Sequence, residues 1–271
     1  MKKTILFLTD LNNGEDEDLI TIKYLKQDFT ITVSYFYNIE NIEKNFDLII
    51  IRNTWPSNES KLNKYNKLKQ DFLKRAKIKK LKIYNDLNAS CDRKGKDYLV
   101  KLYENSFPVI PSIDLINNFS KLPKVKEYLI KPKNGFSSIG IKVIKKNDIK
   151  KIKLNNQIIQ PKFNFQYELS FYFVDNELLY CLIFEPSKVP NWPKPKIYNP
   201  TKKEVDFAMQ FLNWNKMKFG ICRVDALRLP NGKLLLLEIE DDSPYFSITE
   251  IDKKFQQLFL KKILKSIKKI I

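Results

Sequence analysis

In the first third of the chain, short apolar runs alternate with longer stretches in which apolar residues recur at helical spacing. The runs at residues 5–9, 31–37, 47–52 and 82–85 predict strands, and residues 15–27 and 58–76 predict helices. Continuous apolar strands that alternate with helices are typical of a parallel sheet covered by helices. Functional residues of such folds gather at the carboxyl ends of strands, where Asp10 and the stretch 52–56 lie.

From about residue 90 the pattern changes to short strands followed by a helix, which indicates an α+β fold. We expect a helix at 96–105, an extended link at 108–111 and a further helix at 201–214. Strands are expected at 128–131, 139–145, 157–160, 167–174 and 178–186, and a proline-rich loop at 191–200.

The last segment, residues 249–271, has apolar residues at helical spacing with lysines between them. Such a pattern is typical of a basic amphipathic helix at a membrane surface. It equally describes a terminal helix that docks on the domain with its lysines in solvent. We favour docking, because lysine is abundant along the whole chain.

The most informative stretch is residues 219–246, where Asn231 and Gly232 lie between two apolar runs. This dipeptide predicts a β-hairpin with a two-residue loop. If Pro230 pairs with Lys233, counting back places Asp225 opposite Glu238 and Arg223 opposite Glu240. Opposed residues, and residues two apart on one strand, share a sheet face. The four side chains should therefore form one cluster.

Facing carboxylates in a largely buried sheet repel each other, and without partners they are costly or take up protons. A divalent cation would remove this conflict. An all-carboxylate set suits a hard ion such as Mg²⁺, which binds one or two carboxylates plus substrate phosphates. The alternative is a structural ion-pair network in which Arg223 is the counter-charge.

Charge alone suggests a nucleic acid or an anionic membrane as partner, because the formal net charge is +18 and the pI is about 9.5. Of the 49 basic residues, 44 are lysines, and the five arginines are Arg52, Arg75, Arg93, Arg223 and Arg228. Proteins that recognise nucleic-acid bases prefer arginine. We therefore expect no dedicated nucleic-acid site and attribute the charge to compositional drift, although it would help attract anionic substrates.

The three cysteines are far apart and form no disulfide framework, which favours a reduced, cytoplasmic protein. The first apolar run has six residues, too few for a signal peptide, and no run approaches the roughly 20 residues of a membrane span. Histidine is absent, so neither imidazole catalysis nor the usual zinc sites are available. The oligomeric state stays open.

Two lysines occupy unusual positions. Lys131 ends a buried strand, where a phosphate would be a suitable partner. Lys96 opens a helix, where a cation is unfavourable unless an anion binds there. The loop 133–140 contains two glycines and two serines, and its backbone N–H groups could face phosphates. The alternatives are solvated surface lysines and a plain hairpin loop.

The order of these features resembles that in ATP-grasp ligases, most closely their glutathione-synthetase-like branch. The resemblance rests on Lys96, then Lys131 with its loop, then Gln160-Pro161, and finally Arg-x-Asp and Glu-x-Glu on the hairpin. It implies an α/β N-terminal (pre-ATP-grasp) domain with a parallel sheet at 1–90. An α+β ATP-grasp fold of two subdomains would follow at 91–271, with its lid at about 108–161 and the nucleotide held between the two subdomains.

The resemblance also implies roles for individual residues. The phosphates would be held by Lys96 and Lys131, and the loop with Ser137 and Ser138 would close over them. The adenine hinge would be Gln160, Pro161, Lys162 and Phe163, and Glu168 would hold the ribose or order the hinge. Asp225, Glu238 and Glu240 would bind Mg²⁺, as two ions and with Mn²⁺ as an alternative, and Arg223 would stabilise the transferring phosphate. Many relatives have Asn where Glu240 stands.

The implied activity is that of an ATP-dependent carboxylate–amine ligase, which forms an acyl phosphate and releases ADP and phosphate. Its substrates would be a small-molecule or peptide carboxylate and an amine. Arg52 could clamp the substrate carboxylate with Trp55 as a wall, or it could form a structural ion pair with Asp47 or Glu59. The alternatives are a ligase that adds an amino acid to a protein end, a non-catalytic nucleotide-binding protein, and a nucleic-acid or membrane-surface binder.

Overall fold

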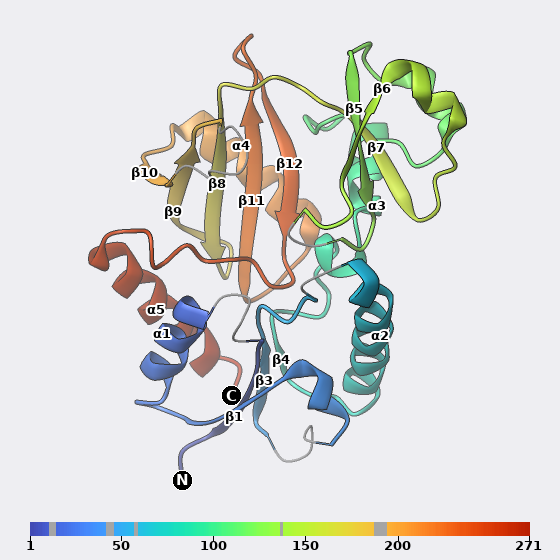
Figure 1. Ribbon diagram of the computed structural model, residues 1–271. Helices are drawn as coiled ribbons and strands as arrows, with labels where there is room; N and C mark the ends of the chain where they lie inside the picture. Colours follow the sequence, from blue (N-terminus) through green and yellow to red (C-terminus); the bar gives the residue numbers. More distant parts are fainter. Residues whose placement is uncertain (11–14, 42–45, 57–58, 136–137, 187–193) are drawn as a thin grey trace.

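The computed structural model describes residues 1–10, 15–41, 46–56, 59–135, 138–186 and 194–271. Within these residues three β-sheets follow one another along the chain, with helices packed against them (Figure 1). None of the helices described in these ranges is long and apolar enough to cross a membrane.

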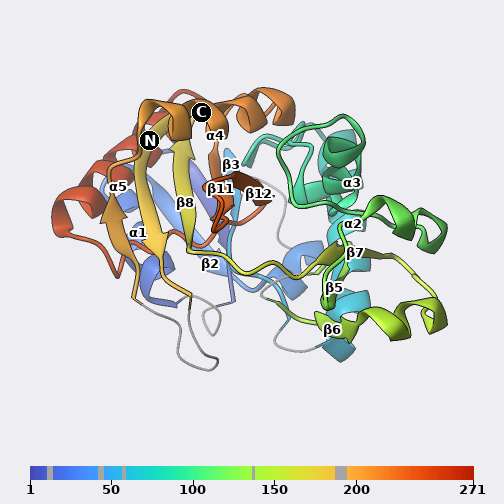
Figure 2. The ribbon, with the colours of Figure 1, turned by 90° about the horizontal axis from the view of Figure 1, so that it is seen from above.

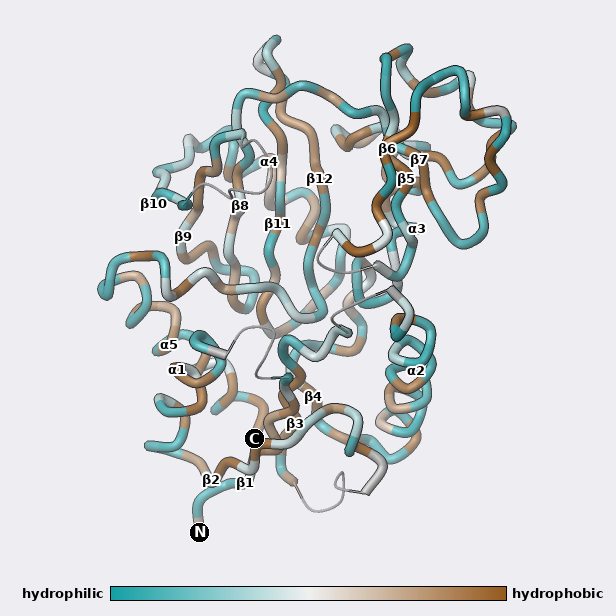
Figure 3. Tube along the Cα trace, viewed as in Figure 1, coloured by the Kyte–Doolittle hydropathy of each residue, from teal (hydrophilic) through white to brown (hydrophobic). Residues whose placement is uncertain are grey.

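The first sheet is parallel, as predicted, with the strand order β2-β1-β3-β4. Its strands are β1 (Thr4–Leu8), β2 (Thr30–Ser34), β3 (Leu48–Ile51) and β4 (Ile83–Tyr84), and its helices are α1 (Glu15–Leu25) and α2 (Leu62–Ile78). Alternate residues of β1 enter different hydrophobic clusters, one with α2 and one with α1. The helices thus cover both faces of the sheet. Figure 3 shows the resulting hydrophobic stretches along β3 and β4. Residues 36–37, predicted as strand, belong instead to a 3-10 helix, Phe36–Asn41.

The second sheet is small and antiparallel, with the order β6-β5-β7. Its strands are β5 (Glu127–Pro132), β6 (Lys142–Lys145) and β7 (Gln157–Pro161), and α3 (Asp97–Glu104) precedes them. Short 3-10 helices lie at Ile116–Lys121 and Lys146–Lys151. Seen from above, this sheet stands to one side of the larger sheet (Figure 2). It has a hydrophobic cluster of its own around Tyr128, Ile130 and Ile159.

The third sheet is antiparallel, with five strands in the order β10-β9-β8-β11-β12. They are β8 (Tyr167–Val174), β9 (Glu177–Phe184), β10 (Lys196–Tyr198), β11 (Ile221–Arg228) and β12 (Leu234–Glu240), and α4 (Lys202–Asn215) precedes β11. Thr201 caps α4 in a reciprocal capping box with Glu204. β10 is a correction: it lies in the segment predicted as loop, where its three residues pair with β9. Residues 191–193 of that segment lie outside the described residues.

The hairpin register confirms the predicted pairs Arg223 with Glu240 and Asp225 with Glu238. The predicted turn, however, is wrong. The N–H of Leu229 bonds the carbonyl of Lys233 at 2.8 Å, so the loop has one residue more than expected. A β-bulge between the Asp225 and Ala226 pairs then shifts the register back. The two one-residue offsets cancel, which leaves the charged cluster where counting placed it.

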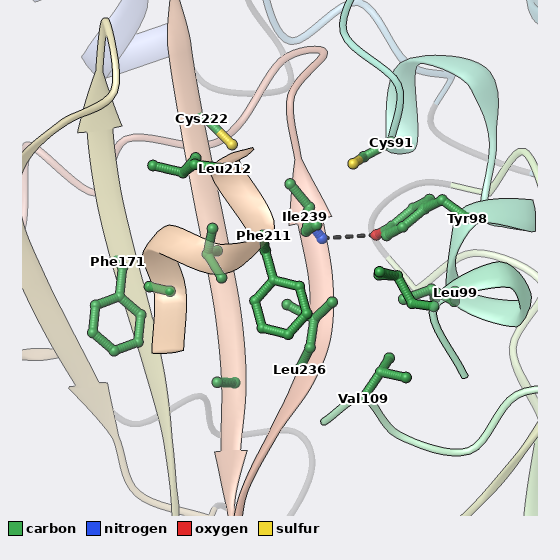
Figure 4. Close-up of a cluster of buried hydrophobic side chains, with 14 of the residues drawn as sticks. Cys91, Tyr98, Leu99, Val109, Phe171, Phe211, Leu212, Cys222, Leu236 and Ile239 are labelled. Atoms are coloured by element: carbon green, nitrogen blue, oxygen red, sulfur yellow. Dashed lines mark hydrogen bonds between the residues drawn. The ribbon is translucent and has the colours of Figure 1, made fainter. Parts of the chain in front are cut away.

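The outer edge of β12 is covered by the chain that follows α3. The backbone of Leu236 bonds Pro108 and Ile110 at 2.8 and 3.0 Å. The N–H of Ile239 donates to the Tyr98 hydroxyl at 2.7 Å, within the hydrophobic cluster drawn in Figure 4. An uncovered strand edge would expose these polar groups. The contacts on both sides of Glu238 fix its backbone at the edge of the sheet.

The C-terminal helix α5 (Lys253–Lys268) docks on the body of the protein, as favoured from the sequence. Its face formed by Phe259, Leu260 and Ile263 is buried in a cluster with Phe7 of β1 and Tyr172 of β8. The first and third sheets therefore share one hydrophobic core. The predicted domain boundaries at residues 90, 108 and 161 stay predictions.

Candidate functional site

A cavity of about 1220 Å³ lies between the small sheet and the five-stranded sheet. Its lining includes Lys131 and Ser138 from one side and Glu168, Arg223 and Glu238 from the other. Pockets for one small ligand typically measure about 300–1000 Å³. The cavity therefore has room for more than one ligand.

Three carboxylates meet on the floor of this cavity. Oxygen atoms of Asp225, Glu238 and Glu240 lie within 4.8 Å of one another. The hairpin register places them together, because Asp225 faces Glu238 and Glu240 lies two residues further on the same face. Only oxygen donors are present, which is the ligand set of a hard divalent cation.

Arg223 is the counter-charge that the ion-pair alternative requires. Its Nε lies 2.9 and 3.0 Å from the two Asp225 oxygens, and its Nη2 donates to Asp225 at 2.8 Å and to Glu240 at 2.7 Å. One guanidinium thus serves two carboxylates. The same residues could consequently form either a structural ion-pair network or a cation site.

The carboxylates nevertheless outnumber the cations near them. Burial raises the pKa of Glu240 to about 8, although Arg223 opposes the shift. Burial, followed by the charge of Asp225, also raises the pKa of the neighbouring Glu168 to about 8. A divalent cation would stabilise the charged forms, so the residues present fit such an ion.

Mg²⁺ should bind more tightly at pH 8 than at pH 6. Metal ligands must be deprotonated, and with a folded-state pKa of about 8 Glu240 holds its proton at pH 6. Calorimetric titration with MgCl₂ at both pH values measures the difference. An affinity that is the same at pH 6 and pH 8 would show that Glu240 does not bind the ion.

Lys96, at the N-terminus of α3, is almost fully buried beside this cluster. Its Nζ donates to Glu238 at 2.8 Å and to Asp92 at 2.8 Å. Asp92 is a cavity residue that was not predicted from the sequence. Gly95, with a φ of 95°, interrupts the helical backbone between Asp92 and Lys96, so no helical spacing in the sequence pointed to this pair.

Lys131 lies at the end of β5 and is only 7% exposed. Burial lowers the pKa of its ammonium group, because the charged form is poorly solvated. Among the residues described here, no carboxylate lies within ion-pair distance of Lys131. A buried cation that faces a cavity suits an anionic ligand such as a phosphate.

Of the predicted loop serines and hinge residues, the described cavity lining includes only Ser138. Ser138 lines the cavity with a φ of 60°, and Ser137 lies outside the described residues. The buried Gln160 donates to Ser112 at 2.8 Å, and Lys162 pairs with Glu127 at 2.7 Å near the surface. In the described part of the chain, the cavity lining does not include the hinge (Gln160, Pro161, Lys162 and Phe163). The hinge role stays a prediction.

Arg52 follows β3, but it does not face the cavity. It is 3% exposed, pairs with Glu17 and with Asp18 (3.2 Å) of α1, and stacks 3.4 Å from the ring centroid of Phe246. The structure favours the ion-pair alternative over a substrate clamp, with partners other than the expected Asp47 and Glu59. Trp55, in contrast, lines the cavity.

Arg52→Lys should lower the melting temperature, because lysine cannot reproduce a guanidinium shared between two carboxylates. Breaking a buried ion pair costs about 3–5 kcal/mol, and a lysine that keeps one contact should lose less. Thermal unfolding measures the change. An unchanged melting temperature with a raised KM for an acid substrate would restore Arg52 to the site.

Comparisons with known proteins agree on the architecture. No protein-family model and no curated protein sequence matches the chain. Among solved structures, D-cycloserine synthetase DcsG superposes with a TM-score of 0.76 at 16% identity, over 97% of this chain and 99% of that one. D-alanine–D-alanine ligase from Bacillus anthracis, complexed with ATP, gives 0.69 at 11% identity over 100% and 99%. The chain has the ATP-grasp fold.

A further structure with this fold is the ATP-grasp ligase PsnB, complexed with a phosphomimetic variant of its minimal precursor, Mg and ADP. It has a TM-score of 0.62 at 10% identity and covers 97% of this chain and 99% of that one. Since the superpositions include nearly the whole chain, the ATP-grasp fold comprises the parallel sheet as well as the two antiparallel sheets. The predicted fold class is confirmed.

Proposed function

We propose that this protein is an ATP- and Mg²⁺-dependent ligase that joins a carboxylate to an amine and releases ADP and phosphate. The observation that supports it most is the carboxylate cluster Asp225, Glu238 and Glu240 in one cavity with the buried Lys96 and Lys131. Solved structures with this fold include ligases bound to ATP, or to Mg and ADP.

The residues fit the needs of phosphoryl transfer, which are positioning and charge neutralisation. Asp225, Glu238 and Glu240 would hold Mg²⁺, which supplies positive charge near the phosphates when bound. Lys96 and Lys131 would bind the phosphates. Acid–base groups contribute little to this chemistry, so the absence of histidine is no obstacle.

In the proposed reaction an oxygen of the substrate carboxylate attacks the γ-phosphorus of ATP. The bond between that phosphorus and the β,γ-bridging oxygen breaks, and ADP leaves. The amine then attacks the acyl carbon of the acyl phosphate, loses a proton and displaces inorganic phosphate. Arg223, which lines the cavity beside the cluster, would stabilise negative charge on the phosphoryl group.

The charge of the cavity argues against nucleic-acid binding at this site. Among the described residues, its lining contains eight acidic side chains and four basic ones, whereas the chain as a whole has a net charge of +18. A nucleic acid would be repelled by such a surface. Divalent cations and an amine substrate fit it better, and we therefore propose a small-molecule acid and amine as substrates.

The products of turnover test this function. Incubation with ATP, Mg²⁺ and mixtures of small acids and amines should release ADP and phosphate in equal amounts, as separated by ion-exchange chromatography. Stoichiometric AMP and pyrophosphate would contradict the acyl-phosphate route. No nucleotide binding at millimolar ATP would contradict the function altogether.

A further inference from the structure

The ion pair between Lys96 and Glu238 joins two residues to which the proposed function gives different ligands. Glu238 would bind the metal ion, and Lys96 would bind a phosphate. In the structure they bind each other, since Nζ of Lys96 lies 2.8 Å from Oε2 of Glu238. Neither can serve its own ligand fully while this contact persists.

Asp92 completes the arrangement around Lys96. Its Oδ2 accepts from the same Nζ at 2.8 Å, so two of the three ammonium donors are used and two negative charges offset one positive charge. The other oxygen of Asp92, Oδ1, is buried and has no hydrogen-bond partner. Asp92 therefore has spare capacity to hold Lys96 without help from Glu238.

Lys131 lines the same cavity as Lys96 but differs from it in its charged neighbours. Its neighbours in the described part of the chain include no carboxylate at ion-pair distance. Of these two cavity lysines, Lys131 is consequently available to an anion, whereas Lys96 is engaged by carboxylates.

We propose that Glu238 changes partners: a divalent cation at the carboxylate cluster takes it from Lys96, and Lys96, still held by Asp92, then binds the nucleotide phosphates. Asp92 is thereby a positioning residue for Lys96. This inference rests on the proposed function. It follows from the geometry, because a divalent ion attracts a carboxylate more strongly than an ammonium group does.

The exchange predicts a coupling between metal and nucleotide beyond their direct contact. Binding of the ion releases Lys96 for the nucleotide, and by reciprocity the nucleotide strengthens binding of the ion. A direct contact between metal and phosphate also couples the two ligands. The decisive measurements are therefore those made without metal, where a contact between metal and phosphate cannot contribute.

Calorimetric titration with a non-hydrolysable ATP analogue, in EDTA and in Mg²⁺, tests the exchange. Lys96→Met should change the affinity in EDTA less than twofold and weaken it about tenfold in Mg²⁺, the scale of one hydrogen bond to a charged group. The matched variant Lys131→Met should weaken binding in both conditions, because Lys131 is available in both.

Glu238→Gln should change the affinity for the ATP analogue in the opposite direction. It frees Lys96 and should tighten metal-free binding of the analogue about tenfold. In the double variant with Lys96→Met this gain should disappear, which separates release of Lys96 from the general loss of a negative charge. Melting temperatures check that each variant is folded.

Asp92→Asn tests the positioning role without removing either partner of the exchange. It should leave metal-free affinity unchanged and weaken binding in Mg²⁺, when Asp92 alone holds Lys96. Equal effects of Lys96→Met with and without metal, or a Glu238→Gln gain that persists in the double variant, would overturn the exchange alone. A wild-type protein that fails to bind the analogue in Mg²⁺ would overturn the proposed function with it.

Discussion

Glu238→Gln is expected to lower ADP release more than a hundredfold while the protein stays folded. Loss of a residue that merely supports a metal ligand typically costs about 10–100-fold, and a direct ligand should cost more. Burial opposes ionisation of Glu238, but Lys96 and Lys131 lower its pKa to about 2, so the side chain is charged and ready to bind a cation. Turnover is measured by a coupled ADP assay, and folding by the melting temperature.

Glu177→Gln is the matched control for this variant. Glu177 lies at the start of β9, and its carboxylate pairs with Lys262 at the protein surface, away from the cavity lining. The same change of carboxylate to amide should leave turnover intact there. A folded Glu238→Gln protein with normal turnover would mean that the carboxylate cluster is structural.

Lys131→Ala should weaken nucleotide binding by roughly 1.5–3 kcal/mol, or about 10- to 150-fold, the worth of a hydrogen bond to a charged group. The same change should cost little stability. Burial disfavours the charged ammonium and lowers its pKa, so removing it also removes a solvation penalty. Calorimetry with ATP and Mg²⁺ gives the affinity, and thermal unfolding gives the stability.

Lys67→Ala, on the exposed face of α2, serves as the control for diffuse electrostatics. It removes the same charge outside the cavity lining and should leave the affinity unchanged. If both variants lose affinity equally, the net charge of the chain attracts the nucleotide and Lys131 does not define a site.

The hairpin shows why local sequence can predict a site even when a detail is wrong. The periodicity of two placed Arg223, Asp225, Glu238 and Glu240 on one face, and the structure keeps those pairs. Counting from the turn cannot detect the longer turn or the bulge that compensates for it. The buried face of α5 was likewise readable, because its apolar spacing is strong and regular.

Arg52 and Asp92 show what the sequence could not provide. The partners of Arg52, Glu17 and Asp18, lie about 35 residues earlier on a helix across the sheet. Only the packed structure brings them together. Asp92 was overlooked because its role depends on Lys96 reaching Glu238, more than 140 residues away. β10 is a three-residue strand that pairs with β9, in a segment whose prolines favour a loop.

A crystal structure with ADP and Mn²⁺ tests the central claim most directly, since the anomalous signal of manganese locates the ion. We expect a peak between the carboxylates of Asp225, Glu238 and Glu240, with Lys131 on the phosphates and Lys96 turned from Glu238 toward them. Bound ADP without a peak at the cluster, with Arg223 and Lys96 still paired to the carboxylates, would contradict it.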